Sequence, residues 1–89
     1  MNRADRIAAT LTATFAPHRL RVTDDSAQHA GHAGATAGGE THYTVELESD
    51  AFRGQGRLAR SRAVHAALQP EFDSGLHALS LRLDTPKGA

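Results

Sequence analysis

Strict alternation of apolar and polar residues in three short segments limits the fold of this chain more than any other feature. The alternation runs over residues 19–23, 42–48 and 77–83. Because successive side chains of a β-strand point to opposite faces, a period of two predicts strands that are buried on one face only. The sequence therefore predicts one sheet with one covered face and one wet face.

Two segments with helical periodicity can cover this sheet. In the first, apolar residues recur at every fourth position, namely Ile7, Leu11 and Phe15. Asn2 and Asp5 have the spacing of an N-terminal capping box, and Pro17 ends the segment. The second helix is expected from about Arg57. One side of it gathers Leu58, Ser61, Val64, His65 and Leu68. Pro70 should end or kink it, because proline lacks a backbone donor and would crowd the carbonyl of Ala66.

A long stretch without bulky apolar residues separates the first two predicted strands. It runs over residues 24–39 and contains four glycines, so it cannot pack into a core, and a flexible loop is expected over about residues 25–40. Two strands joined directly by such a loop should pair antiparallel. The second helix instead crosses over between two strands, so the last strand should lie parallel to a neighbour with a right-handed connection.

These elements predict an α+β fold in the order α-β-β-α-β. The expected architecture is a two-layer sandwich, a three-stranded mixed sheet covered on one face by two helices. One domain should occupy residues 1–84, and residues 85–89 should form a C-terminal tail.

Composition excludes several classes of function. The chain has no cysteine, so it cannot by itself supply a disulfide, a thiol nucleophile or a cysteine-held metal. Ten basic residues balance ten acidic ones, which gives no overall attraction to nucleic acid or membrane. No apolar run approaches the roughly 18 residues of a membrane span. A serine elbow, a phosphate loop and a catalytic carboxylate pair are also missing. A cytoplasmic monomer that is not an enzyme is expected.

Several short motifs in order along the chain resemble those of the BolA-like proteins. They are Asp24-Asp25-Ser26 followed by His29, Gly39-Glu40-Thr41-His42-Tyr43, Phe52-Arg53-Gly54, Arg60-Ser61-Arg62 with Val64 and Leu68, and His77-Ala78-Leu79-Ser80-Leu81. The resemblance covers nearly the whole chain and implies a class II KH-like fold. It also implies one of two roles. The first is partnership with a monothiol glutaredoxin through a bridging 2Fe-2S cluster in iron–sulfur or iron homeostasis. The second is DNA binding in transcriptional regulation.

The resemblance assigns the cluster ligands of this chain to His29 and His77. Neutral imidazole is a good iron ligand and is compatible with a two-iron cluster. Because the chain has no thiolate, the other two ligands would come from a glutaredoxin cysteine and from glutathione, and the isolated chain would bind no cluster. His32 is an alternative loop ligand. The competing interpretations are a solvated loop residue for His29 and a histidine at the rim of the core for His77.

The other histidines are expected to have simpler roles. His42 lies on the outward face of its strand and is expected to be exposed. His65 is expected to pack on the inner edge of the second helix, and His18 to lie on the surface. A zinc site at His29 and His32 has too few ligands, because structural zinc takes four.

Four arginines within ten residues could serve the DNA-binding alternative: Arg53, Arg57, Arg60 and Arg62. They could equally be the solvated flanks of the helix or pair with Glu46, Glu48 and Asp50. The same helix and the last strand could form the surface that meets a protein partner. RNA binding of the ordinary KH kind is not favoured, because the turn at residues 53–56 is one residue short of Gly-x-x-Gly. Two positions depart from the family pattern: Ser61 replaces the histidine of Arg-His-Arg, and Pro70 should shorten the helix.

Overall fold

The computed structural model describes residues 1–26 and 41–86, which form one sheet and a layer of helices. The elements in chain order are α1 (Arg3–Phe15), β1 (Arg19–Asp24), β2 (His42–Glu48), the 3₁₀ helix η2 (Asp50–Phe52), α2 (Arg57–Ala67), α3 (Gln69–Asp73) and β3 (Ala78–Asp84). The predicted order is confirmed, with one additional short α-helix. Most of the loop predicted over residues 25–40 and most of the predicted tail lie outside the described residues.

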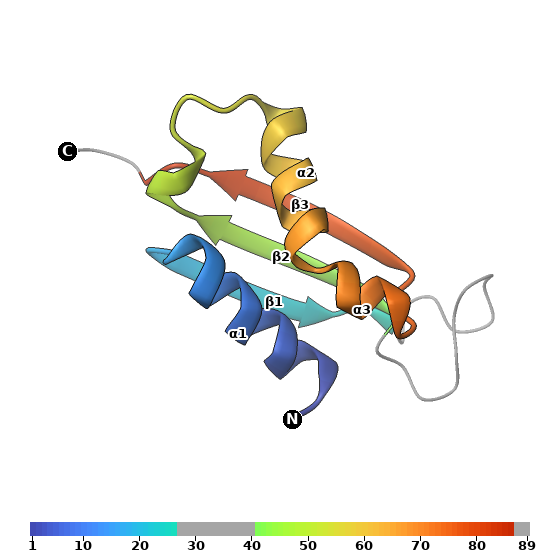
Figure 1. Cartoon of the computed structure of the whole chain (residues 1–89). Coiled ribbons are helices and arrows are strands. Elements are labelled where there is room, and N and C mark those ends of the chain that lie inside the picture. The colour runs from blue at the N-terminus through green and yellow to red at the C-terminus, as the bar shows by residue number, and fades with distance from the viewer. Residues whose placement is uncertain (27–40, 87–89) are drawn as a thin grey trace.

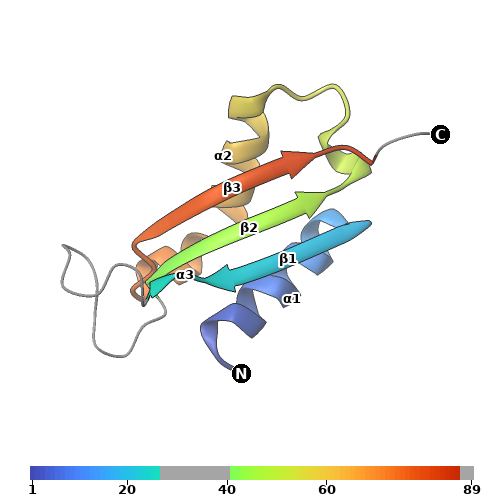
Figure 2. The same ribbon diagram turned by 180° about the vertical axis from the view of Figure 1, so that it is seen from behind.

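The sheet has the order β1-β2-β3 and is mixed, as predicted. β1 pairs antiparallel with β2, and β2 pairs parallel with β3, so that His42 lies opposite Ala78. The three α-helices lie on one face of this sheet (Figure 1). Seen from behind, the strands lie in front and their other face is uncovered (Figure 2). The α+β two-layer architecture is therefore confirmed.

The core lies between β2 and the helices, where the two sequence periodicities meet. α1 begins at the predicted capping box, in which Asn2 Oδ1 accepts a hydrogen bond from the Asp5 amide at 2.9 Å. The predicted inward residues of α1 and β2 are buried together with residues of the α2 region: Ile7, Leu11, Phe15, Tyr43, Val45, Leu47, Phe52, Val64, Leu68 and Leu76. Burial of these apolar side chains is the main favourable contribution to folding.

Pro70 was predicted to end or shorten the second helix, and the structure shows two helices in this region instead of one. α2 ends at Ala67, but the chain turns helical again as α3, with Pro70 in its first turn. Proline is tolerated there because the first helical amides have no partner within the helix. The prediction of two helices was therefore incomplete. The prediction for Leu58 was wrong: its side chain is 62% exposed, because the first turn of α2 is exposed at residues 57–59.

A buried ion pair fastens α3 to α1. Arg3 Nη1 donates to Glu71 Oε1 at 2.8 Å, and both residues are 8% exposed. Arg3 also donates to Ser74 Oγ and to the Ser74 carbonyl. The turn that follows needs Gly75, whose φ is +126° and whose place for a Cβ lies 3.2 Å from Arg3 Nη2. These contacts fasten the turn at Ser74 and Gly75 to α1.

None of the helices in the described residues is long and apolar enough to cross a membrane.

Candidate histidine site at the start of β3

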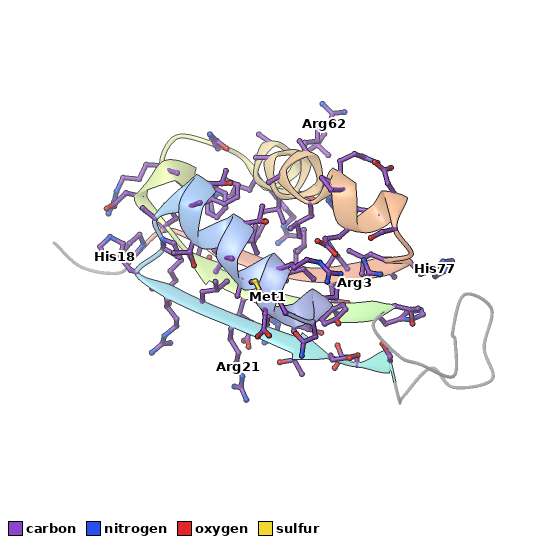
Figure 3. All side chains as sticks on the ribbon, turned by 60° about the horizontal axis from the view of Figure 1, so that its bottom comes forward. Met1, Arg3, His18, Arg21, Arg62 and His77 are labelled. Atoms are coloured by element: carbon purple, nitrogen blue, oxygen red, sulfur yellow. The ribbon has the colours of Figure 1, made fainter. Side chains whose placement is uncertain are left out.

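His77 lies immediately before β3, at one end of the sheet. The prediction began the last strand at His77, but β3 begins at Ala78, and His77 is exposed. Its backbone amide donates to the Thr41 carbonyl at 2.8 Å, and the Ala78 amide donates to the same oxygen at 3.1 Å. Figure 3 shows the His77 side chain at the opposite end of the molecule from His18. The imidazole is thus presented to solvent from a fixed point on the backbone.

Ser26 and Thr41 border the segment of residues 27–40 and are bonded to each other. Ser26 Oγ accepts hydrogen bonds from the Thr41 amide at 2.9 Å and from the His42 amide at 3.1 Å. Ser26 and Thr41 are only 5% and 4% exposed. Because Thr41 also holds the His77 amide, both borders of this segment lie beside His77. His29 and His32 themselves lie outside the described residues.

His42 is buried, so the expectation that it is exposed was wrong. Its residue is 7% exposed, and Nδ1 lies 2.9 Å from Thr41 Oγ1. The centroid of its ring is 5.3 Å from that of His77, with 49° between the ring planes. Strand alternation predicts an exposed side chain at His42, but Thr41 and His77 lie against its ring. That contact joins the starts of two strands, which a single segment of sequence cannot reveal.

His77 is the exposed imidazole among the side chains described at this end of the sheet. Within residues 1–26 and 41–86, no group of three or more His, Asp or Glu side chains gathers around a common point. The exposed imidazole of His77 has the chemistry of an iron ligand. Ser26 and Thr41 were quoted within the motifs but assigned no role, and their hydrogen bonds were not predictable from spacing.

The four arginines do not form one free patch. Arg53 Nε donates to Asp50 Oδ1 at 2.8 Å, which is the pairing that the alternative interpretation named. The hydrogen bond from His18, followed by that from Arg53, holds the pKa of Asp50 below its ordinary value. Arg60 donates to the carbonyls of Gln55 and Leu83, at 2.9 and 3.0 Å.

Arg57 and Arg62 are exposed, and Arg62 projects from α2 away from the sheet (Figure 3). Arg53 and Arg60, by contrast, are hydrogen-bonded to neighbouring groups. Arg53, Arg57, Arg60 and Arg62 therefore differ in how easily a phosphate could reach them.

An open groove of about 820 Å³ runs between α2 and β3. It is lined by Gln55, Gly56, Arg57, Arg60, Ser61, His65, Leu79, Leu81, Arg82, Leu83 and Asp84. Arg82 was not singled out from the sequence; its outward phase on the last strand was the available signal. His65 was expected to pack, and its ring stacks on Phe72 with centroids 5.4 Å apart, although the residue is exposed overall. β3 has no strand beyond it in the described sheet, so the groove follows a free sheet edge.

Comparison with known proteins places this chain in a family. The sequence profile described as BolA-like protein matches residues 11–88. A Sinorhizobium sp. protein named "Uncharacterized protein in cobS 5'region" is 42% identical over 87 residues, covering 97% of this chain and 94% of that protein. The DNA-binding transcriptional regulator BolA of Escherichia coli is 39% identical over 83 residues, covering 93% of this chain and 75% of that protein.

The fold is also similar to that of a solved plant domain. The structure of the BolA domain of SufE1 from Arabidopsis thaliana superposes with a TM-score of 0.88 at 43% identity, covering 97% of this chain and 94% of that domain. The chain spans only 24% of the full-length SufE-like protein 1. Sequence profile, relatives and fold agree with the motifs from which the resemblance was drawn. The chain belongs to the BolA-like protein family.

Proposed function

We propose that this chain is the partner of a monothiol glutaredoxin and supplies histidine ligands to a 2Fe-2S cluster that the two proteins share. The proposed ligands are His77 and His29, with His32 as the alternative to His29. A cysteine of the glutaredoxin and the thiol of glutathione would provide the other two. When bound, such a cluster would supply a redox-active and transferable iron–sulfur centre.

The observation that carries this proposal is the placement of His77. Its imidazole is exposed, its backbone is held by Thr41, and Thr41 is one border of the segment that contains His29. Ser26, the other border, is bonded to Thr41 and precedes His29 by three positions in the chain. The two ends of the segment that contains His29 therefore lie beside the backbone of His77.

The α2–β3 groove is the proposed contact surface for the partner protein in the absence of a cluster. It combines exposed arginine side chains with leucines of β3, and Leu58 lies exposed in the first turn of α2. Aromatic, arginine and apolar side chains are the usual components of protein interfaces. This surface is separate from His77, so loss of the cluster ligand should leave binding of the cluster-free partner intact.

Visible circular dichroism tests the cluster proposal during titration of this chain into a cluster-loaded monothiol glutaredoxin with glutathione. A new spectrum that saturates at a ratio of one to one is expected. His77→Ala and His29→Ala should each abolish it, whereas His18→Ala, at the other end of the molecule, should leave it in place. If His29→Ala keeps the spectrum and His32→Ala removes it, His32 is the loop ligand. An unchanged glutaredoxin spectrum at all ratios would overturn the proposal.

The second candidate function is DNA binding by α2, favoured by the name of the E. coli relative, which is that of a regulator rather than an enzyme. Arg57 and Arg62 are exposed and able to meet phosphates. Binding should then weaken with salt, with a slope that falls by about 0.9 for each phosphate contact removed. Arg57→Ala and Arg62→Ala should each lower the slope, and Arg53→Ala should lower it less because Arg53 is paired with Asp50. Equal slopes for all variants would argue against this function.

A further inference from the structure

We propose that His42 is a positioning residue for His77: it supports the imidazole of His77 from the buried side without itself binding the cluster. The inference rests on the proposed function, since it concerns how the ligand of that shared cluster is held. Nothing in the family motifs assigns this role to His42. It follows from the contact between the two rings at the start of β2 and β3.

The geometry favours support over coordination. At 7% exposure, the His42 ring is enclosed and offers little surface to a cluster carried by another protein. His77 is exposed and its ring centroid lies 5.3 Å from that of His42. At this separation and tilt the two rings are in contact. His42 therefore limits the orientations available to the His77 ring on one side, leaving the other side open to a ligand.

The His42 ring is itself held in place. Its Nδ1 lies 2.9 Å from Thr41 Oγ1, and its backbone amide donates to Ser26 Oγ. Thr41 also holds the backbone of His77 through its carbonyl. The same residue thus fixes both the main chain of the ligand and the ring that lies against it. A ligand whose backbone and ring are both constrained loses little freedom when a metal binds.

Removal of residues that orient a metal ligand typically costs about 10-fold to 100-fold in metal affinity. We therefore expect His42→Ala to release the shared cluster about 10-fold faster than the wild-type chain. His42→Phe keeps an aromatic ring against His77 but loses the bond to Thr41. It should release the cluster at a rate between those of His42→Ala and wild type.

The first experiment uses the cluster-free chain and so does not depend on the proposed function. Carbon-13 relaxation of the His77 ring, measured by NMR, should show greater ring mobility in His42→Ala than in wild type. His18→Ala is the matched control, because His18 is an exposed histidine at the other end of the molecule (Figure 3). A His77 ring that is equally ordered in the folded His42→Ala chain and in wild type would overturn the inference. If His42→Ala does not fold, a His77 ring more ordered in His42→Phe than in wild type would overturn it.

The second experiment measures cluster loss from the heterodimer by the decay of visible circular dichroism. If His77→Ala prevents the spectrum and His42→Ala accelerates its decay, both the proposed function and the inference are supported. If His77→Ala prevents it but folded His42→Ala and His42→Phe decay at the wild-type rate, the inference fails and the function stands. If His77→Ala leaves the spectrum unchanged, the proposed function fails and the inference falls with it. The ring-mobility result would then describe only the cluster-free chain.

Discussion

Two buried polar clusters hold this small fold together, and they differ in where their hydrogen bonds end. One joins α1 to α3 through Arg3, Glu71 and Ser74. The other lies at the start of β2 and contains Ser26, Thr41 and His42. Both satisfy polar groups that burial would otherwise penalise. They are therefore alike in stabilising the chain, but only the second contacts a candidate metal ligand, His77.

We call the first cluster closed because it contains no candidate metal ligand: the guanidinium of Arg3 meets the carboxylate of Glu71 and the side chain and carbonyl of Ser74, and Arg6 also donates to Glu71. The second extends outward to His77, whose amide binds Thr41 and whose ring lies against His42. A closed cluster has only a structural effect when it is broken. The second cluster, which we call open, ends on the exposed imidazole of His77. Breaking it should affect both the stability of the chain and the binding of a metal by His77.

Breaking the closed cluster should have the largest effect on stability. Glu71→Ala leaves the buried guanidinium of Arg3 without its carboxylate, and we expect the free energy of unfolding to fall by about 3 kcal/mol. Urea denaturation measures this change. Under conditions where the variant is folded, it should form the proposed 2Fe-2S cluster with the glutaredoxin as wild type does.

The control for Glu71→Ala is a surface ion pair. Arg21 Nε lies 4.0 Å from Glu46 Oε2, and the Arg21 side chain projects from the uncovered face of the sheet (Figure 3). Arg21→Ala should cost less than about 1 kcal/mol, because exposed pairs contribute little. Equal losses for the two variants would contradict the closed-cluster interpretation.

Breaking the open cluster should lower the free energy of unfolding less than Glu71→Ala does, but it should also weaken the proposed binding of the 2Fe-2S cluster. Ser26→Ala removes the acceptor shared by the Thr41 and His42 amides, and we expect a loss of about 2 kcal/mol in urea denaturation. Since Thr41 holds His77, the proposed 2Fe-2S cluster shared with the glutaredoxin should also be lost faster. If Ser26→Ala is less stable but loses the 2Fe-2S cluster at the wild-type rate, then the hydrogen bonds of Ser26 do not influence metal binding by His77.

Acid should weaken the closed cluster in a defined pH range. The hydrogen bond from Arg6, together with the charges of Arg6 and Arg3, holds the pKa of Glu71 below its ordinary value of 4.5 despite burial. Because the folded-state pKa is the lower one, the stabilisation is complete above the unfolded-state pKa and is lost as the pH falls through the folded-state pKa. The difference in free energy of unfolding between wild type and Glu71→Gln should therefore be constant above pH 4.5 and narrow below it. A difference that stays constant down to pH 2 or so would exclude this linkage.

The fold could be predicted where local pattern and tertiary contacts agree. The alternation of residues 42–48 gave the correct strand and the correct core face, because β2 is the central strand and packs against the helices. The capping box of Asn2 and Asp5 located the start of α1. The helical pattern could not show that the first turn of α2 is exposed, so Leu58 was wrongly placed in the core.

The candidate site was less predictable because its contacts join distant residues. The motif led to His77, but the alternation indicated neither its exposure nor the start of β3 at Ala78. Alternation assigned His42 to a wet face, whereas it is buried and in contact with Thr41 and His77. No spacing rule relates Ser26 to Thr41 across fourteen intervening residues. The closed cluster was missed for the same reason, since Arg3 and Glu71 are 68 positions apart.

The central claim is that His77 binds the shared cluster, and electron paramagnetic resonance with nitrogen-15 histidine in this chain alone tests it most directly. The reduced cluster of the heterodimer should show hyperfine coupling to nitrogen-15. His77→Ala should lose the coupling assigned to that ring, while His18→Ala should retain it. A reduced cluster whose spectrum carries no nitrogen-15 coupling, or one identical in wild type and His77→Ala, would contradict the account.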